Sequence, residues 1–373
     1  MNRSLEKPAR SGKDIAANAV ICPVAVTLLL PAPALSPDPS PITVRTSPLA
    51  ELCACLHALD EPDHHPAAAR WVARVHAGAD EDLLSRATAW APLWSAFRAR
   101  YLLPLTPGPR RTLEEELQDI EAIPIDDFVT MTLQALIGKN NAAIGDDVLH
   151  RLRLISSSRL ELGSRVRADP DGFRTSLLDF LTDFAAAAFT PEWPAMKAVL
   201  DREATAREHT LHRRGPLALA DLPAATALDG RIVLDKLYNA TVQIDAHRPC
   251  LLVPTLYGQP HFVVKHYPGY PVVIQYGMSP STAPSLETIR HRLAVLQDPT
   301  RLRLCYAILR NPVATSELAN QLGMSAPQVS RHLRKLREAE LVHVHRRGSV
   351  VYYQLDAAAI ERLGPQLLSV LYR

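Results

Sequence analysis

Residues 315–342 read TSELANQLGMSAPQVSRHLRKLREAELV, and this stretch decides the fold of the C-terminal part of the chain. Apolar residues at three- and four-residue spacing predict a short helix over 316–322 and a second helix from 326 to about 340. We expect Thr315 and Ser325 to be their N-caps, with a tight turn at Gly323-Met324-Ser325 between them. Two short helices joined by such a turn are typical of a helix-turn-helix.

The flanking residues extend this pattern in both directions. Before it, we expect helices over 286–296 and 299–310, the second one capped by Asp298. The apolar face expected for that second helix consists of Leu302, Cys305, Ile308 and Leu309. After it, 341–345 and 350–355 predict a β-hairpin with a basic tip at 346–349, and 357–372 predict an apolar helix. This order of elements predicts a winged helix-turn-helix over 285–373.

The helix that begins at Ala326 has one apolar and several polar faces. Val329, Leu333 and Leu336 fall on the core face. Polar groups near the start of such a helix reach base edges in the major groove, and a basic wing tip follows the DNA backbone or enters the minor groove. The residues expected to contact double-stranded DNA are Ser325, Ala326, Gln328, Ser330, Arg331, His332, Arg334, Lys335, Arg346 and Arg347.

The charge distribution agrees with this prediction. The whole chain of 373 residues has a net charge of only +2. Residues 285–373 hold 13 Lys and Arg against 7 Asp and Glu, which leaves 28 basic and 32 acidic residues in the remainder. A basic end on an acidic body is expected when only one module meets phosphate.

The C-terminal region resembles the ArsR/SmtB family of bacterial repressors. The resemblance is carried by residues 296–309 (LQDPTRLRLCYAIL), 315–342 and 346–355 (RRGSVVYYQL). It implies a homodimer in which the first and last helices of the module, 286–296 and 357–372, form the contact. The two recognition helices would then read half-sites about one helical turn apart on the operator.

The metal ligands known in that family are missing here. Its Cys-x-Cys box would fall in the third helix, where residues 316–320 read SELAN, and its other site needs histidine on the last helix, where only Glu361 is available. The resemblance therefore implies no metal and no cofactor. We expect a non-metal signal, a small-molecule effector or a partner, to act through the N-terminal domain.

Residues 44–59 (VRTSPLAELCACLHAL) and 228–234 (LDGRIVL) resemble an uncharacterised domain that precedes such modules in ArsR-type regulators. Helical spacing dominates from 49 to about 215. The clearest helical segments are 81–101, 113–121, 128–137, 174–189 and 195–213. Expected start signals are Asp80, Thr112 with Glu115 as a capping box, and Thr190-Pro191-Glu192 before the last segment.

Strands are expected at 24–30 and, within a β-rich part at about 230–278, over 232–234, 250–253, 261–264 and 272–275. Residues 36–48 are expected to be extended or loop, and 279–285 to form a hinge. The predicted fold class is mainly α with a small β-rich connector and a C-terminal α+β winged helix. The predicted domains are a flexible extension over 1–20, a regulatory and dimerisation domain over 21–278, and the DNA-binding domain over 285–373.

Several other residues allow two interpretations. Cys53 and Cys55 are two positions apart on a helix and point to different sides, so packing is favoured over a metal or redox role. His57, His64 and His65 leave a metal site open, provided that four ligands converge. His209 and His212 are interpreted as surface residues. The aromatic residues Trp71, Trp90, Trp94, Phe97, Tyr101 and Trp193 line either a core or a pocket.

The predicted function is a sequence-specific DNA-binding regulator, a homodimeric repressor in the cytoplasm. Five scattered cysteines argue against a disulfide framework. Asp14 interrupts the basic N-terminal region and prolines break the apolar stretch 16–35 that follows, which disfavours export and a membrane partner. The alternative functions are a winged-helix protein-interaction module and a ligand-binding protein without operator recognition. An enzyme is not expected, since no phosphate loop, dinucleotide fingerprint or nucleophile elbow is present in the sequence.

Overall fold

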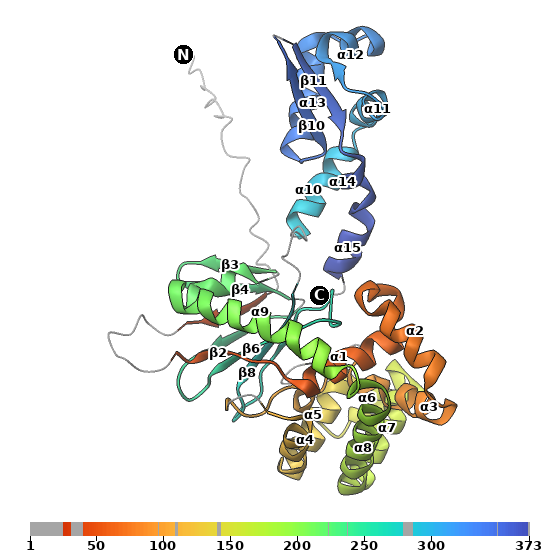
Figure 1. The fold of residues 1–373 in the computed structure, drawn as a ribbon, viewed down its shortest axis with the longest axis vertical. Helices are drawn as coiled ribbons and strands as arrows, with labels where there is room; N and C mark the ends of the chain where they lie inside the picture. The colour runs from red at the N-terminus through yellow and green to blue at the C-terminus, as the bar shows by residue number, and fades with distance from the viewer. Residues whose placement is uncertain are drawn as a thin grey trace, which may run out of the picture.

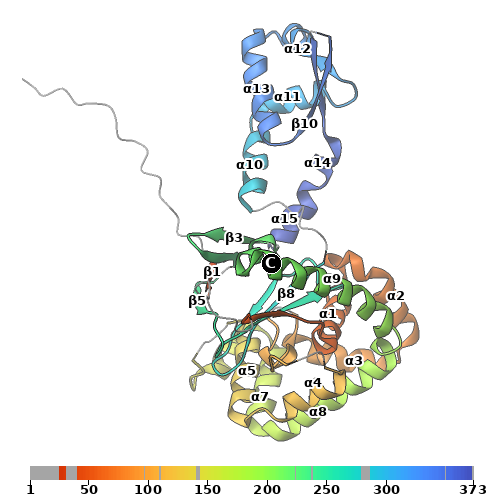
Figure 2. The ribbon, with the colours of Figure 1, turned by 60° about the vertical axis from the view of Figure 1, so that its left-hand side comes forward.

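The computed structural model describes residues 25–30, 40–95, 97–108, 111–139, 143–222, 224–236, 238–278, 286–348 and 350–371. The predicted extension over 1–20 and the predicted hinge over 279–285 lie outside these residues. Figures 1 and 2 show a large body of helices and sheets and, beyond it, a smaller winged domain. No helix in the described part of the chain is long and apolar enough to cross a membrane.

The region predicted to be helical from 49 to about 215 is helical. Its α-helices are α1 (Pro48–Asp60), α2 (Ala69–Gly78), α3 (Glu81–Trp90), α4 (Leu113–Glu121), α5 (Ile125–Ile137), α6 (Val148–Ile155), α7 (Ser157–Ala168), α8 (Pro170–Phe184) and α9 (Trp193–Arg214). Short helical turns lie between them: η1 (Pro62–His64), η2 (Pro66–Ala68), η3 (Ala91–Leu93), η4 (Arg100–Leu102), η5 (Ala185–Phe189, a π-helix) and η6 (Pro216–Asp221).

Two helix starts behave as predicted. The Asp80 side chain accepts a hydrogen bond from the Leu83 backbone N–H at 2.7 Å, and Thr112 and Glu115 form the predicted capping box. Two other boundaries were wrong. The helix predicted over 81–101 ends at Trp90, because Pro92 has no N–H to donate to the carbonyl of Thr88. The last helix begins at Trp193 with Pro194 in its first turn, rather than at Thr190-Pro191-Glu192.

The β-rich part is not a connector, so this part of the predicted fold class was wrong. It forms two four-stranded sheets, in the orders β3-β4-β1-β5 and β2-β6-β8-β7. Their strands are β1 (Ala25–Leu29), β2 (Ile42–Val44), β3 (Ala225–Leu228), β4 (Arg231–Asp235), β5 (Ala240–Gln243), β6 (Cys250–Thr255), β7 (Val263–Lys265) and β8 (Val272–Gly277). Because β1 and β2 come from the start of the chain, the sheets bind the two ends of this domain together.

The helices bury most of the aromatic residues in one core. Trp71, Trp94, Tyr101 and Phe128 are fully buried there, so the core interpretation holds for most of the aromatic set. Trp94 also lines a cavity together with Phe97. A second core packs both sheets against Ala204 of α9 and its neighbours. The histidines His209 and His212 on the other side of α9 are exposed, as predicted.

The winged domain has the predicted order of elements, with one additional short strand. It consists of α10 (Leu286–Leu296), α11 (Pro299–Ala307), β9 (Val313–Ala314), α12 (Thr315–Leu322), α13 (Ala326–Glu338), β10 (Val342–Arg347), β11 (Val350–Leu355), α14 (Ala357–Glu361) and α15 (Leu363–Leu371). Helix α11 ends three residues before the predicted Arg310. The apolar helix predicted over 357–372 is broken at Arg362, because Pro365 cannot donate to the Glu361 carbonyl.

Candidate nucleic-acid interface

Helix α13 is positioned by the turn that precedes it. Gly323 ends α12 in the left-handed conformation (φ +63°), which favours glycine because it lacks a Cβ. Ser325 then caps α13: the Gln328 side chain accepts hydrogen bonds from the Ser325 backbone N–H and hydroxyl, both at 3.0 Å. The predicted cap of α12 was wrong, since Thr315 is its first helical residue and Ala314 holds the cap position without a side-chain hydrogen bond.

One face of α13 is buried and the others are open to solvent. Val329, Leu333 and Leu336 are completely buried, as the apolar spacing predicts. Of the predicted DNA-contacting residues on this helix and its cap, His332 is half-buried and the others are exposed: Ser325, Ala326, Gln328, Ser330, Arg331, Arg334 and Lys335. Arg334 lies 3.9 Å from Glu338, an exposed pair that contributes little energy. The helix therefore presents hydroxyl, amide and guanidinium groups on one open surface.

The wing is the β10–β11 hairpin, and its two predicted basic residues lie in strand β10. Arg346 pairs with Val351 and Arg347 with Val350, so both arginines end β10 instead of forming the turn as predicted. Because side chains alternate along a strand, the two arginines point to opposite faces of the hairpin. Arg347 lies over the Tyr352 ring at 6.0 Å. Both arginines are exposed, and they extend the basic surface beyond α13.

Two buried arginines, which the sequence analysis missed, hold the helices of this domain together. Arg292 of α10 donates to the Ala339 carbonyl at 3.1 Å and pairs with Glu340 at 2.9 Å, directly after α13. Arg301 of α11 pairs with Asp298 at 3.2 Å and donates to the Val295 carbonyl. An arginine in a helix is usually solvated, so the sequence carries no local signal for either tie.

The apolar face predicted for α11 is rotated. Leu304, Cys305 and Ile308 are buried, which confirms packing for Cys305, whereas Leu302 is 51% and Leu309 42% exposed. Arg301 completes the buried row at spacings of three and four residues. Helix α11 thus exposes Leu302 and Tyr306, the latter 83% exposed, and Leu309 is exposed just after the helix ends.

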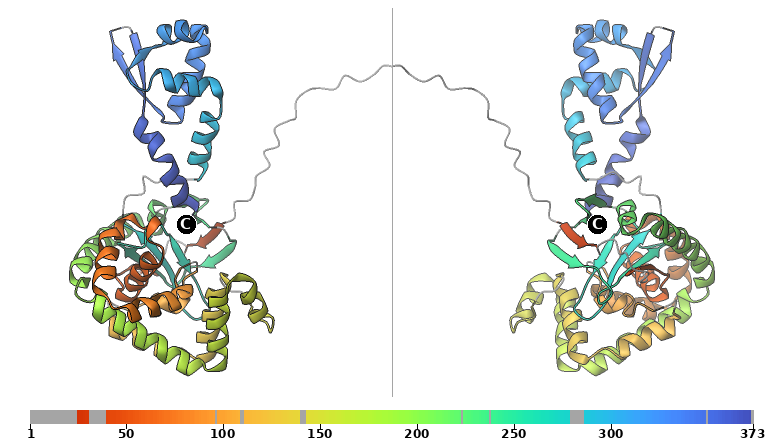
Figure 3. Two further views of the ribbon diagram at one scale, coloured as in Figure 1. Left: turned by 90° about the vertical axis from the view of Figure 1, so that its right-hand side faces the viewer. Right: turned by 90° about the vertical axis from the view of Figure 1, so that its left-hand side faces the viewer.

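One end of the winged domain lies near the N-terminal domain and the other end points away from it. The ends of α10 and α15 lie nearest to the N-terminal domain, and α12 lies at the far end (Figures 1 and 3). The tip of the β10–β11 hairpin is also remote from the body in these views. In this arrangement the N-terminal domain does not cover the wing.

Comparison with protein families identifies both parts of the chain. Residues 35–282 match the model described as "Family of unknown function (DUF5937)". The chain belongs to the DUF5937 family. Residues 298–344 match "Bacterial regulatory protein, arsR family", so this DUF5937 protein carries an ArsR-family helix-turn-helix. Residues 25–30 and 40–278 are called the DUF5937 domain below, and 286–371 the winged domain.

The similar proteins are ArsR/SmtB-type transcriptional regulators. The regulator KmtR of Mycobacterium tuberculosis is 38% identical over 69 residues, which cover 18% of this chain and 53% of KmtR. The transcriptional repressor SdpR of Bacillus subtilis is 29% identical over 66 residues, 18% of this chain and 73% of SdpR. The crystal structure of NolR from Sinorhizobium fredii has 31% identity, covers 23% of this chain and 85% of NolR, and gives a TM-score of 0.20. The chain thus spans about half the length of KmtR, and these matches reach less than a quarter of this chain.

Proposed function

We propose that this DUF5937 protein is a homodimeric transcriptional repressor that binds operator DNA through α13 and the β10–β11 wing. The observation that carries the proposal is the surface of α13, where a buried row of Val329, Leu333 and Leu336 leaves the polar and basic side chains of Gln328 and Arg331 open. Amide and guanidinium groups in this position pair with base edges and phosphates. The proposed contacts are the ten residues predicted from the sequence, with Arg346 and Arg347 on opposite faces of the wing.

The dimer contact is proposed for α10 and α15. These helices pack on each other, and each exposes leucines: Leu286 (44%) and Leu293 (45%) on α10, and Leu368 (51%) and Leu371 (60%) on α15. Neighbouring exposed leucines are unfavourable in water, and a second copy would bury them. Two winged domains joined in this way place two recognition helices on one operator.

The DUF5937 domain is proposed to sense the signal. An effector bound there changes operator affinity only if it binds the DNA-competent and DNA-incompetent states differently. The expectation of a non-metal signal rests on residues 316–320 and 357–372 of the winged domain alone, and it stays a prediction. The cytoplasmic location stays a prediction as well.

Operator binding is tested with DNA from the protein's own promoter region. We expect the full-length chain to bind this DNA in an electrophoretic mobility assay, and Arg331→Ala to weaken binding about 5- to 100-fold, the loss of one base or phosphate contact. The matched control is Arg213→Ala, which removes an exposed arginine from α9 of the DUF5937 domain. Equal binding by wild type and Arg331→Ala across salt concentrations would refute DNA reading by Arg331 of α13. No binding by the wild type would favour the protein-interaction alternative.

A further inference from the structure

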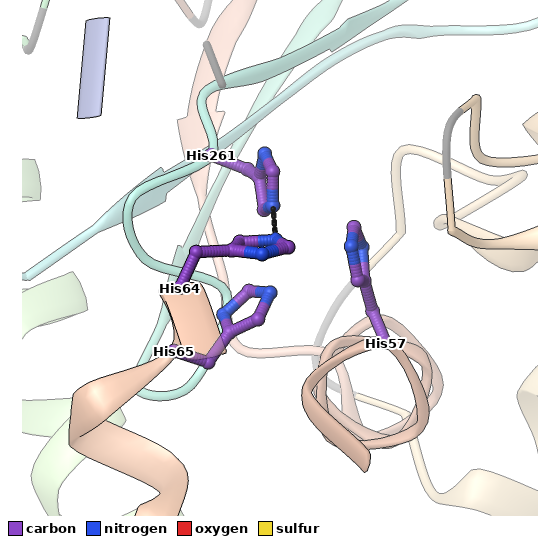
Figure 4. Close-up of side chains that lie close together, drawn as sticks. All are labelled: His57, His64, His65 and His261. Carbon is purple, nitrogen blue, oxygen red and sulfur yellow. Dashed lines mark hydrogen bonds between the residues drawn. The ribbon is translucent and has the colours of Figure 1, made fainter. Parts of the chain in front are cut away.

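Four histidines from separate segments of the DUF5937 domain meet at one point. His57 lies in the last turn of α1, His64 ends η1, His65 follows it, and His261 lies between β6 and β7. One ring nitrogen from each comes within 4.8 Å of those of the other three. Figure 4 shows the four rings turned toward one another. His57, His64 and His65 were the residues for which the sequence left a metal site open, and His261, 197 positions after His64, is the fourth ligand that this required.

The hydrogen bonds of the imidazole rings indicate which ring nitrogen carries a proton and which has a lone pair for a cation. His65 Nδ1 lies 3.0 Å from the Tyr257 carbonyl oxygen, and since a carbonyl only accepts, Nδ1 carries the proton and Nε2 is left as a lone pair. His64 Nε2 and His261 Nε2 are 3.0 Å apart, a distance that two imidazole nitrogens hold only around a shared cation or proton.

Two ring nitrogens of the cluster are available as ligands. Among the described residues, Nε2 of His57 and Nε2 of His65 are buried without a hydrogen-bond partner, in residues that are only 4% and 0% exposed. A buried polar atom without a partner is destabilising. The carboxylate of Glu61 lies 3.9 Å from His57 Nε2 and 3.5 Å from His64 Nε2, at the rim of the cluster.

We propose that His57, His64, His65 and His261 form a binding site for one divalent transition-metal ion. A tetrahedral zinc site has metal–nitrogen distances of about 2.0–2.1 Å, which separate its nitrogens by about 3.3 Å. The observed cluster, with its closest pair at 3.0 Å and all atoms within 4.8 Å, reaches that geometry by small ring movements. The ion would satisfy both unpartnered nitrogens and replace the proton between His64 and His261.

The surroundings hold the ligands in place in the way that metal sites require. Ligating histidines commonly donate their other ring N–H to a carbonyl, as His65 does to Tyr257. The loop that leads to His261 is fixed by the buried Glu51 carboxylate, which accepts from the Thr255 hydroxyl at 2.7 Å and from the Tyr257 N–H at 3.0 Å.

The donor set selects the class of ion. Four neutral imidazoles suit Zn²⁺, Co²⁺, Ni²⁺ or Cu²⁺, whereas Mg²⁺ and Ca²⁺ prefer oxygen. Cys53 and Cys55 lie on α1 with His57, but neither belongs to the group of converging ligand atoms. His57 and His261 also line a cavity of about 310 Å³, which gives the ion a path to the site.

The site is tested on untagged full-length protein that has been treated with EDTA and dialysed. We expect Co²⁺ to bind at one ion per chain with the ligand-field spectrum of a tetrahedral site, Zn²⁺ to displace it, and Mg²⁺ to have no effect. His57→Ala and His261→Ala each remove one of four ligands and should weaken Zn²⁺ binding at least about 100-fold, the upper range for losing a supporting residue alone. The matched controls are His209→Ala and His212→Ala, which remove exposed histidines from α9.

A second measurement separates ligand loss from misfolding. Zn²⁺ should raise the midpoint of thermal unfolding of the wild type and of both α9 controls, but not of His57→Ala or of the smaller change His261→Asn. Metal binding that is absent from the wild type, or equal in wild type and cluster variants, would overturn the proposal. The site does not rest on the proposed repressor function, because operator binding is measured separately on the same EDTA-treated protein.

Discussion

The DUF5937 domain and the winged domain treat their charged side chains in opposite ways. Among the described residues, the DUF5937 domain buries many charged side chains, whereas the winged domain buries only those of Arg292 and Arg301. The buried charged side chains of the DUF5937 domain are Arg45, Glu51, Arg98, Arg100, Glu116, Lys236 and Lys265. Exposed charge suits the recognition of a polyanion, while buried charge is costly and persists only where partners are fixed around it. The difference fits a domain that reads DNA and another that holds an internal site.

Arg45 and Glu116 are the best-defined buried pair. Arg45 Nη2 lies 3.1 Å from Glu116, and the same carboxylate accepts from the Ser47 hydroxyl at 2.8 Å and from the Leu49 N–H at 3.0 Å. Arg45 also donates to the Gly108 carbonyl at 2.9 Å. The pair therefore ties the start of α1 to α4.

The largest expected effect tests whether buried charge supports the DUF5937 domain. Glu116→Ala removes the carboxylate that accepts from the Arg45 guanidinium, the Ser47 hydroxyl and the Leu49 N–H. Leaving these buried donors without this acceptor should lower the free energy of unfolding by about 3–5 kcal/mol. Urea denaturation of the full-length chain measures this loss. The control Glu114→Ala, at an exposed position of the same helix, should stay within about 0.5 kcal/mol. A Glu116→Ala protein as stable as this control would show that the buried pair is not needed.

The same pair predicts a pH dependence of stability. Burial raises the pKa of Glu116 from 4.5 to about 7, against the opposing effect of Arg45, so the folded protein binds this proton more tightly than the unfolded chain. The resulting stability is fully present below pH 4.5 and is lost as the pH rises through about 7, by at most about 3 kcal/mol. Glu116→Gln, which does not titrate, should remove this part of the pH profile. Parallel profiles of wild type and variant between pH 4.5 and 8 would contradict it.

The winged domain could be predicted from the sequence because its signals are local. Ser325, Gly323 and the spacing of Val329, Leu333 and Leu336 lie within a few residues of one another, and each specifies a cap, a turn or a core face by itself. The errors occurred where a proline two or three residues downstream decided a boundary, as at Pro365, or where a buried arginine replaced an expected leucine, as at Arg301.

The DUF5937 domain could be predicted only in part, because its decisive contacts join distant residues. The strand β1 was predicted, but its pairing with β4 and β5 depends on residues more than 200 positions away. The hydrogen bond between Glu51 and Thr255 and the contact of His64 with His261 have the same origin. No periodicity or motif within α1 indicates that a loop before β7 will complete its histidine cluster.

A smaller effect is expected at the proposed dimer contact, where the winged domain exposes leucines of α10 and α15. Leu371→Asp on α15 should raise the dimer dissociation constant at least about 10-fold, since burying one leucine contributes about 1.5–3 kcal/mol. Sedimentation equilibrium over a range of protein concentrations measures the change. Leu154→Asp, at a 74% exposed leucine of α6 in the DUF5937 domain, is the matched control. If both variants associate like the wild type, α15 is not the dimer contact.

The smallest expected effect concerns the wing, and it tests whether the exposed charge of the winged domain contacts DNA. Arg347 contacts the Tyr352 ring only at 6.0 Å, so Arg347→Ala should leave the hairpin and the free energy of unfolding unchanged. If the side chain neutralises one phosphate, the slope of log affinity against log salt falls by about 0.9, and affinity falls less than about 10-fold near 0.15 M salt. Because Arg346 points to the other face of the hairpin, comparing Arg346→Ala with Arg347→Ala in the same salt titration shows which face meets DNA. Unchanged slopes for both variants would assign DNA binding to α13 without the wing.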